Sequence, residues 1–168
     1  MATRVISTKL QLDGEAEYRA SLKNINSELG TLKSDLKLTE SQFAEQLNSY
    51  DAVAAKGETL AKIYEQQEKK LAATNKILKE AQDAQDKFAK AAADAKDKIA
   101  QTEAALDALA GTEGDTSAQQ AELTAELEKY KTELATAEAN QEKATQAVNK
   151  YQTQANRAEA ELNKLGSP

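Results

Sequence analysis

The chain has 168 residues, a formal net charge of −6, and neither cysteine nor histidine. The missing cysteine excludes disulfides and thiolate metal sites, and the missing histidine removes the commonest general base and metal ligand. An acidic balance is unsuited to binding nucleic acid or an anionic membrane surface, which both require clustered Lys and Arg. With 30% charged residues, 2 Phe and no Trp, the composition is typical of long helices that bury thin apolar stripes. We therefore expect an all-α protein.

No targeting segment is predicted. A secretory signal needs a continuous apolar stretch of about 7–15 residues, and residues 1–20 contain none. Charged residues recur too often along the chain for a transmembrane helix. We expect synthesis and first assembly in the cytoplasm.

The N-terminal arm, residues 1–14, differs from the rest of the chain. In the segment Arg4–Leu12, residues alternate with period two and β-branched side chains are dense, which is typical of a short β-strand. One face of this predicted assembly strand carries Ile6, Thr8, Leu10 and Leu12. A single strand leaves its backbone groups unpaired. It must pair with another copy, pair with a partner protein, or stay frayed.

A first helix is predicted over residues 15–48, with Asp13 as its N-cap. Its apolar positions alternate in steps of four and three, which is a heptad pattern. They are Tyr18, Leu22, Ile25, Leu29, Leu32, Leu36, Thr39 and Phe43.

A long second helix is predicted over residues 49–110, capped by Ser49 or Asp51. Its heptad stripe runs from Leu60 to Leu109 without a slip. Pairs of opposite charge four residues apart support its outer face, namely Glu58 with Lys62, Glu65 with Lys69 and Asp94 with Lys98.

A turn is predicted over residues 111–116, because Gly111 and Gly114 stand among Thr, Glu and Asp. Ser117 and Gln120 fit a capping box that begins a third helix over residues 117–166. This helix also carries a heptad stripe, from Leu123 to Leu165, and Gly166 is suited to end it.

Two long helices joined by a short turn favour an antiparallel pair. The predicted fold is therefore a long antiparallel coiled-coil hairpin with an additional N-terminal helix and a short N-terminal strand. Pairing residues whose numbers sum to 229 places seam position against seam position, for example Ala92 opposite Ala137 and Ile99 opposite Tyr130. The main helix-packing seam comprises Leu71, Leu78, Phe88, Ile99, Leu106, Leu123, Tyr130, Leu134, Val148, Tyr151 and Leu162.

The first helix needs a surface on which to bury its own stripe. If it folds back near Asn48–Asp51, Leu29 lies near Leu71 and Leu22 near Leu78. Ile63 and Ile77 lie off the main seam and are suited to receive it. Alternatively, this stripe drives self-association. The sequence leaves both a three-helix layer and an oligomer open.

No catalytic, cofactor-binding or metal-binding residues are predicted. The many carboxylates are expected to lie on solvated helix faces, because a catalytic carboxylate needs a dry pocket that shifts its pKa. The segment Gly111–Gly114 lacks the lysine of a phosphate-binding loop, and the spacing of a calcium loop is missing. We expect no cofactor and no enzymatic activity.

Residues 3–75 resemble the start of tail tape measure proteins of long-tailed phages and prophages of Gram-positive bacteria. The resemblance rests on Val5–Glu15, followed by Glu17-Tyr18, Leu22–Leu29 and Leu32–Leu38. The stretch from Asn48 to Leu60 and the run Tyr64-Glu65-Gln66-Gln67 also resemble that family. Beyond these residues the similarity is that of any coiled coil.

The resemblance implies a structural rod that scaffolds the phage tail and sets its length. Its partners would be tail-tube and tail-tip proteins or other copies of itself, first in the host cytoplasm and then in the virion tail. Family members are much longer and carry hydrophobic segments, so this chain is expected to be an N-terminal fragment or a shortened relative. The alternative is a free-standing helical adaptor or stalk that presents residues 111–117 to a protein partner.

Overall fold

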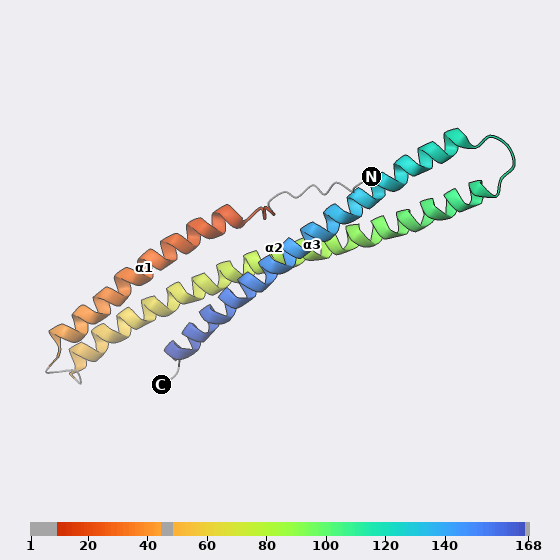
Figure 1. Ribbon diagram of the computed structural model, residues 1–168. Coiled ribbons are helices and arrows are strands. Elements are labelled where there is room, and N and C mark those ends of the chain that lie inside the picture. Colours follow the sequence, from red (N-terminus) through yellow and green to blue (C-terminus); the bar gives the residue numbers. More distant parts are fainter. Residues whose placement is uncertain (1–9, 45–48, 167–168) are drawn as a thin grey trace. The chain divides into compact units, whose positions relative to one another are not determined.

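The computed structural model describes residues 10–44 and 49–166. Within these ranges helices are the only regular structure, namely α1 (Glu15–Gln42), α2 (Tyr50–Ala110) and α3 (Ser117–Gly166) (Figure 1). The prediction of an all-α protein is confirmed.

The predicted assembly strand falls mostly outside the described residues, since Ile6 and Thr8 are not among them. Leu10 and Leu12 are described, are half-buried, and belong to no helix or strand. The part of the chain that the structure describes therefore contains no strand.

Helix α1 ends at Gln42 and not at residue 48 as predicted. Its last turn tightens, because the Ala44 N–H reaches back three residues to the Ser41 carbonyl at 3.4 Å. Such a 3₁₀-type bond commonly closes a helix. The heptad stripe gave no sign of this end, because Thr39 and Phe43 continue its spacing.

The predicted cap of α2 is confirmed at Ser49, whose Oγ accepts the Ala52 N–H at 3.2 Å. The start of α3 differs from the predicted capping box. The carboxylate of Asp115 accepts the Ser117 N–H at 3.0 Å, and the Gln120 side chain donates to the Thr116 hydroxyl at 3.0 Å. Asp115 therefore accepts the Ser117 N–H in place of the Gln120 side chain, and the Gln120 N–H donates to the Thr116 carbonyl at 2.9 Å in place of the Ser117 hydroxyl.

The helices divide into two compact units. Unit 1 contains residues 81–148, and unit 2 contains residues 12–80 and 149–166. The 61-residue helix α2 contributes its C-terminal half to unit 1 and its N-terminal half to unit 2.

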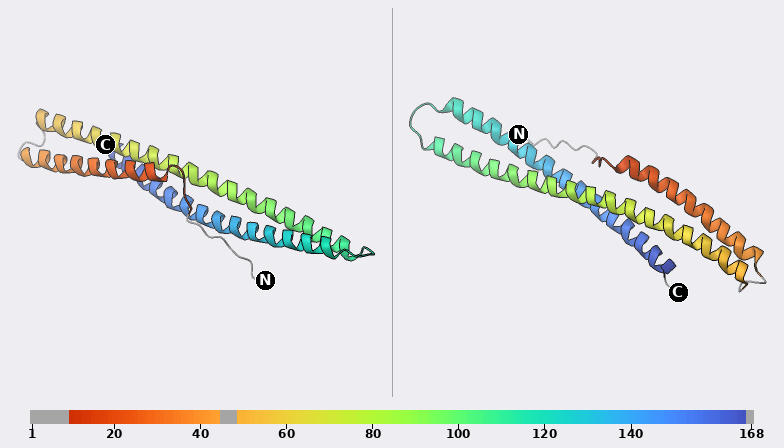
Figure 2. Two further views of the ribbon diagram at one scale, coloured as in Figure 1. Left: turned by 90° about the horizontal axis from the view of Figure 1, so that it is seen from above. Right: turned by 180° about the vertical axis from the view of Figure 1, so that it is seen from behind.

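In unit 2, α1 folds back along the first half of α2, and the two helices lie side by side in all three views (Figures 1 and 2). Their common core is made of Ile25, Leu29, Leu32 and Ile63, with Leu36, Leu60 and Leu165 packed against it. The stripe of α1 is thus buried within the chain, as in the three-helix alternative.

The predicted pairing of α1 with α2 is wrong by two helical turns, because Leu29 packs with Ile63 and not near Leu71. The prediction placed the fold-back at Asn48–Asp51. Since α1 ends at Gln42 and α2 begins at Tyr50, the midpoint of the connection lies earlier. Each residue of α1 consequently meets a residue closer to the start of α2.

Unit 1 buries small side chains most deeply. Ala81 and Ala144 are completely inaccessible to solvent, and Ala92, Ala95 and Ala137 are also buried. Small residues let two helix backbones approach closely, so the larger side chains of the stripe lie beside the contact and stay half-buried. This arrangement is a thin seam with no wide core.

Candidate functional site

A polar joint in unit 2 connects all three helices around Tyr18. The ring of Tyr18 is buried, and its hydroxyl donates to Oε1 of Gln154 on α3. The same hydroxyl lies 3.2 Å from Oγ1 of Thr74 on α2, which itself donates to the Lys70 carbonyl at 2.7 Å. The Tyr18 ring also meets Tyr151 of α3 edge to face, with ring centroids 5.4 Å apart. Hydrogen bonding fixes α1 lengthwise here, which apolar packing alone does less well.

Burial raises the pKa of Tyr151 above its ordinary value of 10.0. The nearby carboxylate of Glu15 and the phenol of Tyr18 raise it further, while Arg19 acts in the opposite direction. Desolvation penalises the charged phenolate, so the joint favours a neutral Tyr151.

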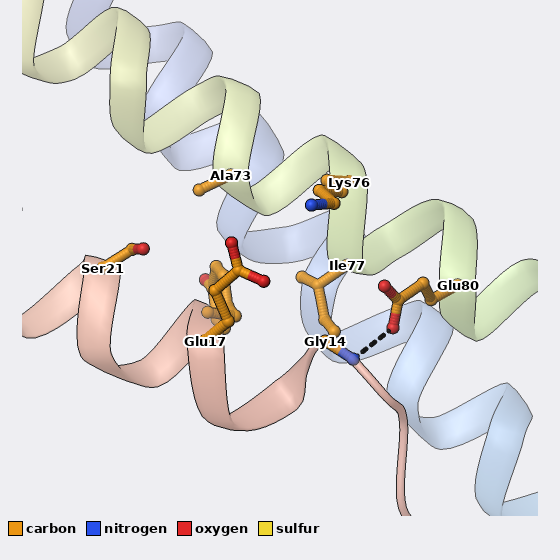
Figure 3. A pocket seen from close by; sticks show the side chains of 8 residues that line it. Gly14, Glu17, Ser21, Ala73, Lys76, Ile77 and Glu80 are labelled. Carbon is orange, nitrogen blue, oxygen red and sulfur yellow. Dashed lines mark hydrogen bonds between the residues drawn. The ribbon is translucent and has the colours of Figure 1, made fainter.

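The N-terminus of α1 is capped by a side chain from α2. Gly14 stands at the N-cap position, and no side chain within α1 caps the helix. Instead, its N–H donates to Oε2 of Glu80 at 2.8 Å (Figure 3). The predicted role of Asp13 as N-cap is therefore wrong. A carboxylate near the positive end of a helix is electrostatically favourable whichever helix supplies it.

Gly14 and Glu80 border a small cavity that Figure 3 shows from close by, together with Glu17, Lys76 and Ile77. Its volume is about 40 Å³. Pockets that bind small molecules measure roughly 300–1,000 Å³. The cavity has space for water-sized guests only, so it offers no substrate site.

The eleven predicted seam residues divide by depth. Leu78 and Tyr151 are buried, and the other nine are half-buried, with none exposed to solvent. Those nine are Leu71, Phe88, Ile99, Leu106, Leu123, Tyr130, Leu134, Val148 and Leu162.

In unit 1, polar contacts link α2 to α3. The amide of Gln85 donates to the Thr145 hydroxyl at 2.8 Å, and the Lys98 ammonium lies over the Tyr130 ring at 5.4 Å. Lys98 was predicted to pair with Asp94, and it makes this cation–π contact instead. The predicted pairs Glu58–Lys62 and Glu65–Lys69 are confirmed at 3.5 and 3.1 Å.

Among the residues that the structure describes, one buried side-chain oxygen has no hydrogen-bond partner. Gln67 lies on the α2 stripe and is 4% exposed, and its Oε1 accepts no hydrogen bond from any described residue. An unsatisfied buried oxygen weakens the packing around it. Thr74 and Thr102 are also polar residues of the α2 stripe, but their hydroxyls are not left unsatisfied. Each donates to the backbone carbonyl four residues earlier, at 2.7 Å.

The tip between α2 and α3 is open to solvent. Gly111, Thr112, Glu113, Gly114 and Asp115 are all exposed. The Ser117 backbone and side chain hold the pKa of the Asp115 carboxyl below its ordinary value by hydrogen bonding. Below the tip, Leu109 and Leu123 line a shallow groove together with Ala105 and Ala108.

The described residues include no group of three or more acidic side chains placed to hold a metal ion. None of the described helices combines the length and the apolar content required to cross a membrane. No protein-family model, no curated protein and no solved structure matches this chain.

Two members of these sites were not found from the sequence. Gln154 stands one position before the stripe residue Ala155, and nothing in its neighbourhood distinguishes it from other surface glutamines. Glu80 is one of 28 acidic residues. It lies opposite Gly14 only because α1 folds back on α2, and the offset between the two helices depends on where α1 ends. Tyr18, in contrast, was identified by its place on the heptad stripe.

Proposed function

We propose that this chain is a structural coiled-coil protein that scaffolds the assembly of a phage tail. The resemblance of residues 3–75 to tail tape measure proteins supports this function. In unit 2, the family-like positions Tyr18, Ile25 and Leu29 are buried contacts between helices. The resemblance therefore falls on residues that organise packing.

The length of the helices supports the proposal most directly. α2 has 61 residues and α3 has 50, whereas helices of globular proteins average about 11–12 residues. Their buried positions form narrow stripes of Ala, Thr and Leu, which suit lengthwise association with other helices. We also propose that α2 and α3 pair as an antiparallel coiled coil in the register that sets Ala92 opposite Ala137.

The source gene and its neighbours provide the first test. A reading frame that continues for hundreds of codons past codon 168, beside genes for tail-tube and tail-tip proteins, is the expected result. A stop codon at that place in an unrelated locus would overturn the tail function.

A second candidate is an adaptor that binds a partner through its tip, and the groove lined by Leu109 and Leu123 favours it. The two functions respond differently to one variant. Thr112→Ala with Glu113→Lys should abolish partner binding if the tip is the binding site, because both residues are exposed there. The tail function predicts that tail assembly is unchanged, with the exposed substitution Glu68→Lys, away from the tip, as control.

A further inference from the structure

The end of unit 1 beside the turn between α2 and α3 carries a strong excess of negative charge. Residues 99–128 contain seven acidic residues and no Lys or Arg, namely Glu103, Asp107, Glu113, Asp115, Glu122, Glu126 and Glu128. The whole chain has 28 acidic and 22 basic residues, so the remainder, with 21 acidic and 22 basic, is nearly neutral. The negative net charge of the chain is therefore concentrated at this end.

An apolar groove lies within this charged segment. This groove, called here the tip groove, has a volume of about 410 Å³ and is lined by Ala105, Ala108 and Leu109 of α2 and by Leu123 of α3. Leu109 and Leu123 are only half-buried, so part of both side chains remains open to solvent. The carboxylates of Glu122 and Glu126 also line the groove, and no described Lys or Arg forms an ion pair with either.

Unit 2 shows which kind of element covers a groove of this type. There, Ile25 and Leu29 of α1 pack on Ile63 of α2, and Leu165 of α3 packs against the same cluster. The part of unit 1 that the structure describes has no such third helix, since its helices are segments of α2 and α3 only. The groove lining on α3 extends over about two helical turns. An amphipathic helix can place two or three apolar side chains over that length.

The charge around the groove decides which helix fits. Burial of apolar surface among so many carboxylates favours a partner that brings Lys or Arg. A second copy of this chain offers no such helix, because acidic residues outnumber basic ones in each of α1, α2 and α3. The stretch Lys69–Lys79 is locally basic, but its large apolar residues Ile77 and Leu78 are buried within unit 2. The occupant is therefore a different protein.

We propose that the tip groove binds a basic amphipathic helix of another protein, with its apolar side chains on Leu109 and Leu123 and its Lys or Arg beside Glu122 and Glu126. This inference rests on the second candidate function, the adaptor, and names the chemistry of its partner. Complementary charge speeds association more than it strengthens the complex. The complex should form rapidly and weaken as salt is added, because salt screens exposed charges.

A synthetic peptide of about 18 residues, with Leu on one helical face and Lys on the other, provides the probe, since shorter isolated helices are marginal. In fluorescence anisotropy the full chain should bind one peptide. Peptides with Glu in place of every Lys, or Ser in place of every Leu, should not bind. Equal binding of either control peptide, or no binding of the basic peptide up to about 1 mM, would overturn the proposal, since weaker affinity is not specific association.

Charge reversal in the chain locates the site. Glu122→Lys with Glu126→Lys should weaken peptide binding about tenfold, a factor equivalent to about 1.4 kcal/mol. Glu68→Lys with Glu159→Lys makes the same change of net charge on exposed residues of unit 2 and should have little effect. Circular dichroism checks that both variants stay helical. Equal weakening by the two pairs would show unspecific attraction and overturn the site.

A neutral substitution tests the groove itself. Ala108 is exposed and lines the groove, so Ala108→Gln should fill it without a change of charge and weaken binding of the peptide. Ala104→Gln, on an exposed residue of the same helix outside the groove lining, is the control. Unchanged binding to Ala108→Gln would overturn docking in the groove.

Failure of this inference differs from failure of the adaptor function. A chain that binds no basic peptide, yet loses its natural partner through Thr112→Ala with Glu113→Lys, is an adaptor for a partner of other chemistry. That result would overturn the inference alone. A chain that binds the peptide in the groove supports the inference even where those two substitutions leave the natural partner bound, a result that would overturn the adaptor.

Discussion

Among single side chains, the Tyr18 hydroxyl allows the clearest measurement of the polar joint. Tyr18→Phe keeps the ring and its contact with Tyr151 but removes the hydrogen bond to Gln154 and the contact of the hydroxyl with Thr74. We expect a loss of about 1 kcal/mol in the free energy of unfolding. Tyr50→Phe makes the same chemical change on an 87% exposed ring and should leave the urea midpoint unchanged. Equal effects of the two substitutions would mean that the joint adds no stability.

The raised pKa of Tyr151 predicts a loss of stability at alkaline pH. Its phenol keeps its proton in the folded chain at pH values where it ionises in the unfolded chain. The contribution of Tyr151 to the free energy of unfolding is therefore fully present below the ordinary pKa of 10.0. It is lost as the pH rises through the higher pKa that Tyr151 has in the folded chain. Urea unfolding from neutral to alkaline pH measures this, with Tyr151→Phe as comparison. A Tyr151→Phe variant whose stability falls as steeply above that pH as the natural chain's would contradict the assignment.

At the scale of the helix, Glu80 should stabilise the start of α1. Glu80→Ala removes the acceptor of the Gly14 N–H, and we expect a cost of about 1 kcal/mol, as for loss of an ordinary N-cap. Hydrogen exchange should accelerate in the first turn of α1. Glu68→Ala provides the control, because Glu68 is an exposed residue of the same helix. An unchanged exchange rate after Glu80→Ala would show that water replaces the carboxylate at no cost.

Two glycines should respond oppositely to alanine. Gly114 has φ +105°, a conformation that side chains rarely adopt, so Gly114→Ala should cost about 1 kcal/mol. Gly30 lies exposed inside α1, and a Cβ there meets nothing within 4 Å. Gly30→Ala should therefore stabilise the chain by about 0.5–1 kcal/mol. Thermal unfolding of both variants provides the measurement, and a change of the same sign in both would contradict the interpretation.

The sequence predicted the helices and their buried stripes well, because both depend on local spacing. Tyr18, Ile25 and Leu29 were placed on the α1 stripe, and each is buried. The offset between α1 and α2 was not predictable in the same way. It depends on the turn at Phe43, where the apolar pattern continues although the helix ends. The cap at Gly14 was missed for a related reason, because Glu80 reaches it only after α1 has folded back.

At the scale of the whole chain, the central question is the register of α2 against α3. Long seams of small residues do not define this register by themselves. In unit 1, Gln85 bonds to Thr145, which adjoins its predicted partner Ala144, and Lys98 lies over Tyr130, which adjoins its predicted partner Lys131. A slip by one heptad would keep apolar residues facing each other. It would, however, separate Ala92 from Ala137, and close approach of the backbones depends on such small pairs.

A disulfide between these two positions would test the register. Ala92→Cys combined with Ala137→Cys should oxidise within one chain and raise the free energy of unfolding by about 4 kcal/mol, the loop-closure value for a loop of this size. Ala92→Cys with Ala144→Cys is the control, because a displacement of about 10 Å along α3 exceeds the span of a disulfide. Preferential oxidation of the control pair would show a register displaced by one heptad. Crosslinks that form only between chains would show that α2 and α3 do not fold back on each other, and the antiparallel coiled coil would then be wrong.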